Sequence, residues 1–220
     1  AMLITLFTQA YRYAAEPFFF RHAADENAMQ TQSEVTKWFT IAATVGMLAI
    51  LLFIDIVKYF LGKDFHSGVG VVPILLGANL LLGVYYNFSV WFRLKDRTGL
   101  GAWISLAGAG ITVLLNILWI PSYGYVGAAW VTLICYFFMS WATWQTGRKH
   151  YPVPYQIGRM AWYAISAFAL WGINLYHEPL LPLAAQWSLR VLFFSAYLVM
   201  IWWLELRSRI TNRLLVENAS

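Results

Sequence analysis

Long apolar stretches separated by short polar segments dominate the pattern of this 220-residue chain. A helix needs about 20 mostly apolar residues to cross the hydrocarbon core of a membrane, because each residue rises about 1.5 Å through a layer about 30 Å thick. Seven stretches approach that length: Met2–Phe20, Trp38–Leu61, Val71–Phe92, Leu100–Ile120, Gly124–Thr146, Ile157–Tyr176 and Leu183–Leu206. The pattern therefore predicts an all-α, polytopic transmembrane helix bundle of about seven spans.

Turn residues and charges mark the breaks between these stretches. Charged tripeptides follow the second and third stretches, and prolines punctuate the later connections, with Pro121 ending the fourth. Thr31 and Glu34 have the spacing of a capping box, in which a Thr side chain and a Glu three residues later satisfy the first amides of a helix. We therefore expect the second helix to begin there, ahead of its apolar stretch.

The composition supports a membrane protein. Hydrophobic residues make up 60% of the chain and charged residues 11%, whereas soluble domains average roughly 45–50% and about 25%. This shortage of charge excludes an ordinary soluble domain, a disordered chain and a nucleic-acid binder, despite the net charge of +5. The single cysteine, Cys135, excludes a disulfide framework and a cysteine-based metal cluster.

The distribution of Lys and Arg predicts the orientation in the membrane. When the seven stretches alternate in direction, one side carries Arg21, Lys37, Arg93, Lys95, Arg97, Arg148, Lys149, Arg159, Arg207, Arg209 and Arg213, and the other Lys58, Lys63 and Arg190. Cytoplasmic loops of membrane proteins are enriched in these residues. We therefore expect a cytoplasmic C-terminus and an outward N-terminus, and we attribute the positive net charge to topology.

The first stretch carries the strongest candidate site. Arg12 and Glu16 lie four residues apart and share one helix face, and a charge at mid-membrane requires a partner or a wet cavity. They could form an intrahelical ion pair, or belong to a polar stripe along a solvated path. The residues of that stripe are Thr5, Thr8, Gln9, Arg12 and Glu16. Pro17 lacks an amide proton, which favours a helix that kinks or opens there.

Other polar and small residues have more ordinary interpretations. Snorkelling, or pairing with Lys58, explains Asp55 more simply than a proton relay does. Hydrogen bonds between helices are expected for three buried asparagines. These asparagines are Asn79, Asn87 and Asn116. Small residues at Gly124, Gly127 and Ala128 predict close packing of two helices.

Signatures of an enzyme are missing from the sequence. The four histidines fall in separate loops without metal-ligand spacing, and no nucleophile elbow or intramembrane aspartate pair is present. We expect no catalytic residues, metal or cofactor, although a membrane enzyme or scaffold whose site assembles from loops stays an alternative.

Three segments resemble a known family. Residues 3–20 (LITLFTQAYRYAAEPFFF) resemble the eighth helix of bacterial polysaccharide flippases of the multidrug/oligosaccharidyl-lipid/polysaccharide exporter superfamily. Val71–Leu76 and Asn116–Trp130 also agree, and the latter contains the Pro-x-Tyr-Gly-x-x-Gly-Ala-Ala hairpin common in this group. The similarity covers nearly the whole chain in the same order.

The resemblance implies a MATE-like fold of fourteen helices, in two six-helix lobes and two additional helices. Residues 1–150 would be five spans of the C-terminal lobe, and residues 151–220 the two additional spans and a cytoplasmic tail. The N-terminal lobe would be missing from this piece. Such flippases move oligosaccharides linked to polyprenyl diphosphate across the bacterial inner membrane, for surface polysaccharides such as the O-antigen of lipopolysaccharide.

Within that picture, Arg12 would pair with the diphosphate or a glycan acid of the cargo, and Glu16 would orient Arg12 or couple to an ion. Thr8 and Gln9 would line the same path. The alternative within the superfamily is a multidrug or small-molecule cation antiporter. The stretch Leu183–Leu206 argues against it, because drug antiporters stop after twelve helices as a rule.

Overall fold

The computed structural model describes residues 2–59, 68–177 and 182–217, and these residues form helices and no strand. The helices are α1 (Met2–Arg21), α2 (Ala28–Leu52), α3 (Ile54–Tyr59), α4 (Val72–Leu94), α5 (Thr98–His150), α6 (Ile157–His177) and α7 (Leu183–Glu217). The predicted all-α fold class is therefore confirmed.

Four helical segments among the described residues are long and apolar enough to cross a membrane. These segments are Ala28–Leu52, Gly68–Leu94, Thr98–His150 and Leu183–Arg207. The third has 53 residues and contains two of the predicted stretches. Helices α1 and α6 contain polar residues such as Arg12 and Asn174 and are not among these four segments. That α1 and α6 also span the membrane stays a prediction. The chain is a multi-pass helical membrane protein.

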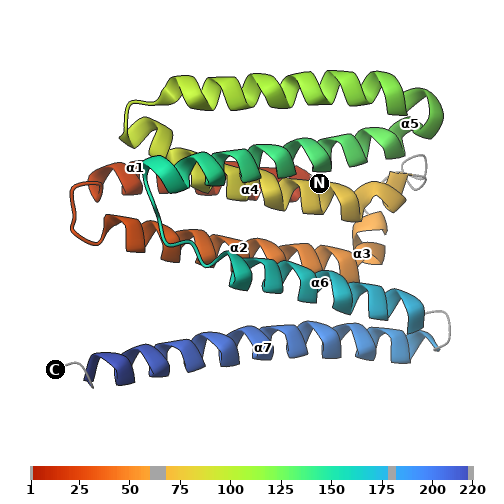
Figure 1. Cartoon of the computed structure of the whole chain (residues 1–220). Helices are drawn as coiled ribbons and strands as arrows, with labels where there is room; N and C mark the ends of the chain where they lie inside the picture. Colours follow the sequence, from red (N-terminus) through yellow and green to blue (C-terminus); the bar gives the residue numbers. More distant parts are fainter. Residues whose placement is uncertain (1, 60–67, 178–181, 218–220) are drawn as a thin grey trace.

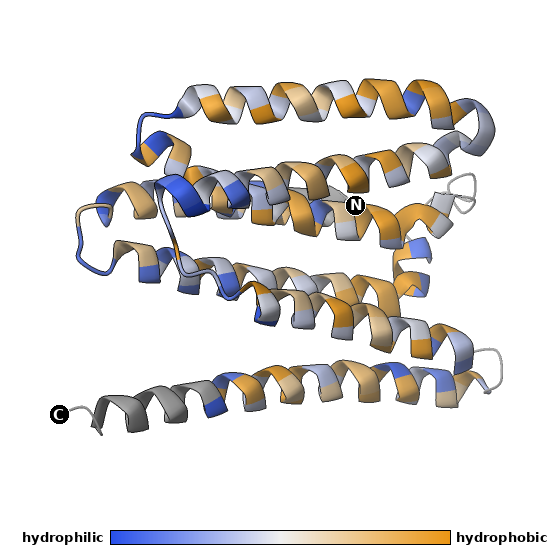
Figure 2. Ribbon diagram, viewed as in Figure 1, coloured by the Kyte–Doolittle hydropathy of each residue, from blue (hydrophilic) through white to orange (hydrophobic). Residues whose placement is uncertain are grey.

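The long helices lie side by side and their connections alternate between two ends of the bundle (Figure 1). We call the end with connections 22–27, 95–97 and 151–156 the cation-rich end, and the opposite end the far end. Hydrophilic residues gather in the connections of the cation-rich end, whereas the middles of the helices are hydrophobic (Figure 2). Successive long helices therefore run in opposite directions, as the prediction of the orientation assumed.

Helix α5 folds back on itself at Gly124, which has φ 56° and ψ −138°. The helix continues through Pro121, where the sequence analysis expected it to end. A Cβ atom at Gly124 would meet no other atom within 4 Å, so this glycine forms the turn and does not pack two helices. Gly127 is different, because a Cβ atom there would lie 3.0 Å from the backbone oxygen of Trp119. Ala128 beside it is half-buried.

The start of α2 differs from the expected capping box. The helix begins at Ala28, and the amide of Thr31 donates to the backbone oxygen of Asn27 inside its first turn. Glu34 instead accepts a hydrogen bond of 2.9 Å from Gln156, in the connection that precedes α6. The capping-box prediction is therefore wrong, because a tertiary contact uses the carboxylate.

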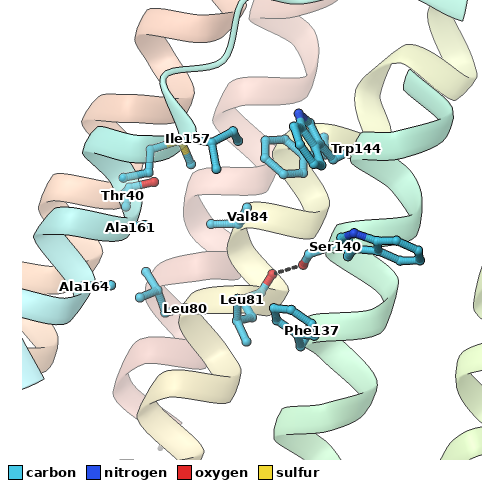
Figure 3. Close-up of a pocket in the computed structure, with 13 residues that line it drawn as sticks. Thr40, Leu80, Leu81, Val84, Phe137, Ser140, Trp144, Ile157, Ala161 and Ala164 are labelled. Carbon is cyan, nitrogen blue, oxygen red and sulfur yellow. Dashed lines mark hydrogen bonds between the residues drawn. The ribbon is translucent and has the colours of Figure 1, made fainter. Parts of the chain in front are cut away.

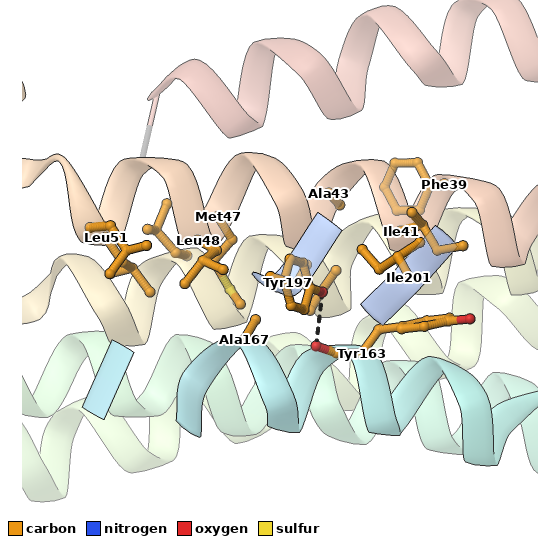
Figure 4. Packing of buried hydrophobic residues seen from close by; sticks show 13 residues of the cluster. Phe39, Ile41, Ala43, Met47, Leu48, Leu51, Tyr163, Ala167, Tyr197 and Ile201 are labelled. Carbon is orange, nitrogen blue, oxygen red and sulfur yellow. Dashed lines mark hydrogen bonds between the residues drawn. The ribbon is translucent and has the colours of Figure 1, made fainter. Parts of the chain in front are cut away.

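The main hydrophobic core forms around α2 (Figure 4). Met47 and Leu48 of α2 are completely buried, together with Tyr163 of α6 and Tyr197 of α7. The Tyr197 hydroxyl donates to the backbone oxygen of Tyr163 at 3.0 Å. Helices α6 and α7 thus pack on α2, while α5 packs on α4. One core joins residues on both sides of position 150, where the sequence analysis placed a division.

Candidate functional site

Arg12 and Glu16 form the ion pair that their spacing suggested, and a second arginine joins them. The Nε atom of Arg12 donates to Oε1 of Glu16 at 2.7 Å. Nη1 of Arg93, from α4, donates to the same oxygen at 3.0 Å. We call these three residues the arginine cluster. Sequence reasoning counted Arg93 only among the cations of one side of the membrane, because no local spacing connects residues 77 positions apart.

An aromatic ring lies beside each of the two guanidinium groups. Arg12 lies 4.7 Å from the ring centroid of Tyr86, and Arg93 lies 6.0 Å from that of Phe20. A cavity of about 200 Å³ opens beside them between α4 and the first turn of α5. Its lining residues are Arg12, Tyr85, Tyr86, Ser89, Phe92, Arg93, Thr98 and Gly101. Guanidinium, phenol and hydroxyl groups therefore converge on one space.

The charges of the arginine cluster are not balanced. Two guanidinium groups share one carboxylate, and all three side chains keep about a third of their surface exposed. Among the described residues, the buried Nε atom of Arg93 has no hydrogen-bond partner. An anion that enters the cavity would meet one excess positive charge. Arginine donors suit phosphate and carboxylate oxygens.

Among the described side chains of the predicted polar stripe, Thr8 and Gln9 do not line this cavity. Thr8 is buried, and its hydroxyl has no partner among the described residues. Gln9 is half-buried and does not line the cavity, and the side chain of Thr5 lies outside the described part. Pro17 is exposed, and α1 continues through it to Arg21. The helix therefore does not end at Pro17, and a kink there stays a prediction.

A buried hydrogen-bonded network lies behind the arginine cluster. The Tyr11 hydroxyl donates to Asn87 Oδ1 at 2.5 Å, which joins α1 to α4. Gln32 of α2 donates to the backbone oxygen of Asn87 and to the hydroxyl of Tyr155, at 3.2 and 2.9 Å. Asn87 thus bonds between helices, as predicted, and Asn79 donates to the backbone oxygen of Leu75 in its own helix. The network fixes α1 and the position of Arg12 on it.

Sequence reasoning missed a second charge cluster, near the cation-rich end. Nζ of Lys37 lies 2.8 Å from Glu205 of α7 and 2.8 Å from Glu34. The Tyr163 hydroxyl donates to Glu205 at 2.6 Å, and Arg159 lies 3.8 Å from the same carboxylate. Lys37 and Glu205 are both buried. The available signal was Glu205 itself, a lone carboxylate inside an apolar stretch.

At the far end, Asp55 pairs with Lys58 at 3.0 Å, as predicted, and also with Arg190 of α7 at 2.6 Å. Asp55 lies in the short helix α3, beyond the apolar segment that ends at Leu52. Because Asp55 lies outside the apolar segment and pairs with two cations, its charge is accounted for without a proton relay.

Comparison with known proteins gives one informative similarity. No family model matches the chain. A protein of Haloferax volcanii named "Probable low-salt glycan biosynthesis flippase Agl15" is 23% identical over 212 residues, which cover 90% of this chain and 44% of that protein. The chain is distantly similar to a glycan biosynthesis flippase. It spans less than half the length of this relative.

The described residues contain no group of three or more His, Cys, Asp or Glu side chains that could hold a metal ion. Neither charge cluster resembles a metal site, because each carboxylate is paired with Lys or Arg. The chemistry that the arginine cluster offers is recognition of an anion.

Proposed function

We propose that this chain is one helical lobe of a flippase that moves an oligosaccharide, linked to polyprenyl diphosphate, across the cytoplasmic membrane. The observation that carries the proposal is the arginine cluster, in which Arg12 and Arg93 share Glu16 beside an open cavity. The similarity to a protein named as a glycan biosynthesis flippase supports the choice of cargo. That relative is archaeal, so the proposal does not depend on a bacterial host.

In this proposal, Arg12 and Arg93 bind the diphosphate of the cargo. Two guanidinium groups provide parallel donors that match phosphate oxygens, and such charge-assisted hydrogen bonds are about twice as strong as neutral ones. Glu16 holds both groups in place when the cargo is absent, and it keeps the affinity low enough for release. Tyr85 and Tyr86 supply the faces on which sugar rings can pack.

A second lobe completes the transporter in this proposal. The cavity borders α1, whose outer side exposes Tyr13 and Pro17 beside the charged pair. Charges at membrane depth must face protein or water. The relative is more than twice as long as the aligned region, and a comparable length would supply the facing wall. Cargo would then cross by alternating access, as two lobes rock around a fixed site.

Replacement of Arg12 in the complete transporter tests the proposal. We expect Arg12→Ala to lower the amount of surface glycan at least tenfold, and Arg12→Lys to retain part of it, because a lysine preserves the charge but not the paired donors. Arg21→Ala is the matched control, since Arg21 is exposed at the end of the same helix. Wild-type glycan from Arg12→Ala, at normal protein abundance, would remove the role of Arg12.

A further inference from the structure

Two adjoining apolar cavities lie along α4 and share no lining residue with the cavity of the arginine cluster. One cavity of about 260 Å³ and another of about 530 Å³ are both lined by Leu80, Leu81 and Ala164. The first reaches Trp144 toward the cation-rich end, and the second reaches Trp130 toward the far end. The two cavities share three lining residues and therefore adjoin, and we describe them together as the apolar groove.

The groove exists because neighbouring helices pack on different partners. Helix α5 packs on α4, whereas α6 packs on α2 and α7, and a space stays open between α5 and α6. Ala161 and Ala164 of α6 leave that space unfilled (Figure 3). Figure 3 shows Leu81 and Val84 of α4 at its base and Trp144 on the α5 side.

Both hydroxyl groups of the lining already donate to backbone oxygens. The Ser140 hydroxyl donates to the backbone oxygen of Leu81 at 2.8 Å, and the Thr40 hydroxyl donates to that of Thr36 at 2.9 Å. The remaining lining is aliphatic and aromatic. Phe137 and Trp141 keep half or more of their surface exposed at the edge, so the groove opens sideways from the bundle. Such a surface on a membrane-spanning helix pair faces lipid chains.

A positive charge lies at the cation-rich mouth of the groove. The guanidinium of Arg148 is 5.1 Å from the ring of Trp144, one helical turn beyond the lining. Arg148 is exposed and belongs to the basic last turn of α5. Trp side chains concentrate where the hydrocarbon core meets the headgroups, so Trp144 places Arg148 at the level of lipid phosphates.

We infer that this groove is a binding site for an anionic phospholipid. One acyl chain lies in the cavity between Val84, Trp144 and Ala161, and the phosphate pairs with Arg148. The positive charge of Arg148 favours an anionic headgroup over a zwitterionic one. The aliphatic and aromatic lining favours an apolar chain. The site is independent of the arginine cluster, whose cavity shares no lining residue with it.

The test uses the 220-residue chain in lipid nanodiscs that contain phosphatidylglycerol or phosphatidylcholine with the same photoreactive acyl chain. Cross-links are mapped by mass spectrometry to Phe137, Trp141 and Trp144. We expect phosphatidylglycerol to label these residues about fivefold more than phosphatidylcholine, as attraction by one interfacial cation gives. Arg148→Gln should reduce this preference to none, while Lys149→Gln, which removes the neighbouring exposed charge, should retain it.

Filling the groove provides a second, independent arm. Ala161→Trp should abolish labelling by both lipids, whereas Ala169→Trp, at an exposed position of the same helix that does not line the groove, should leave it unchanged. Each variant is compared only as a monodisperse protein. Equal labelling by the two lipids in the wild type would overturn the proposal. Equal labelling that an added polyprenyl phosphate abolishes would also overturn it and would assign the groove to an isoprenoid chain.

Discussion

Lys37 and Glu205 show how charged side chains are kept inside an apolar bundle. Lys37 meets two carboxylates at 2.8 Å, and Glu205 meets Lys37, the Tyr163 hydroxyl and, at 3.8 Å, Arg159. Removal of water from a charge costs several kcal/mol, which a buried pair recovers only with good geometry and further hydrogen bonds. The pair therefore holds α7 on α2 and α6 as long as both partners are present.

The two partners are not equivalent, and this gives a testable asymmetry. Lys37→Met leaves the buried Glu205 without its closest cation, so we expect a loss of about 3 kcal/mol or more in folding free energy. Glu205→Gln should cost less, because Lys37 keeps Glu34 as a partner. Thermal unfolding in detergent measures the loss of stability in both variants. Lys58→Met is the control, because the pair of Lys58 with Asp55 is more exposed. Equal losses from the two buried substitutions would contradict this account.

The Asp55–Arg190 pair predicts a dependence of stability on acid. Burial opposes ionisation of Asp55, but hydrogen bonds from Arg190 and Lys58, together with their charges, outweigh it and lower the pKa of Asp55. A lowered pKa in the folded state means that the pair stabilises the protein above the unfolded pKa, about 3.9, and that this contribution is lost as the pH falls through the folded value.

We therefore expect Asp55→Asn to melt below the wild type at pH 7, and the difference to shrink as the pH falls below about 4. Thermal unfolding as a function of pH in detergent gives this difference directly. A constant difference from pH 7 to pH 3 would show that the charge of Asp55 does not hold α3 on α7.

Local spacing predicted some of these pairs and missed others for a physical reason. Arg12–Glu16 and Asp55–Lys58 are one helical turn apart, and the helix period brings such residues together whatever the fold. Arg93 and Arg190 reach their carboxylates from other helices, 77 and 135 positions away. Only the packing of helices decides those contacts, and one sequence without its fold does not contain that information.

At the scale of elements, the hydrophobic pattern predicted the helices better than their ends. Apolar length forces the backbone to satisfy its own hydrogen bonds as a helix, so the long elements were predictable. Short signals placed the ends less well: α2 begins at Ala28 and not at Thr31, where a tertiary contact from Gln156 uses Glu34, and Pro121 does not end its helix, which turns at Gly124 instead. The stretch that contained Asp55 divides into α2 and the short α3.

Gly124 gives a prediction at this scale. Its φ of 56° and ψ of −138° suit glycine, and an L-residue held in such a conformation is strained by about 1–3 kcal/mol. We therefore expect Gly124→Ala to destabilise the α5 hairpin although space for the methyl group exists. Gly110→Ala, inside the same helix and also in open space, should be neutral or stabilising. Thermal unfolding of the two variants in detergent separates backbone strain from steric conflict, and similar melting temperatures would contradict the assigned role of Gly124.

At the scale of the whole molecule, the cations and the connections together define two ends. The connections 22–27, 95–97 and 151–156 lie at one end, and the turn at Gly124 lies at the other (Figure 1). Cytoplasmic loops are enriched in Lys and Arg, which predicts that the cation-rich end faces the cytoplasm. The fold places the connections at two opposite ends of the bundle, and the excess of Lys and Arg predicts which end faces the cytoplasm.

Labelling of single cysteines in intact cells tests this orientation. Cys135 is the one cysteine of the sequence and is buried, so Cys135→Ala provides a background without thiols. In that background, a membrane-impermeant maleimide should label Ser122→Cys in intact cells, and Asp25→Cys and Asp96→Cys only after permeabilisation. Asp25 and Asp96 are exposed residues of two different connections and must behave alike, because one end of the bundle carries both. Labelling of Asp25→Cys together with Ser122→Cys before permeabilisation would contradict a bundle whose helices cross the membrane between the two ends.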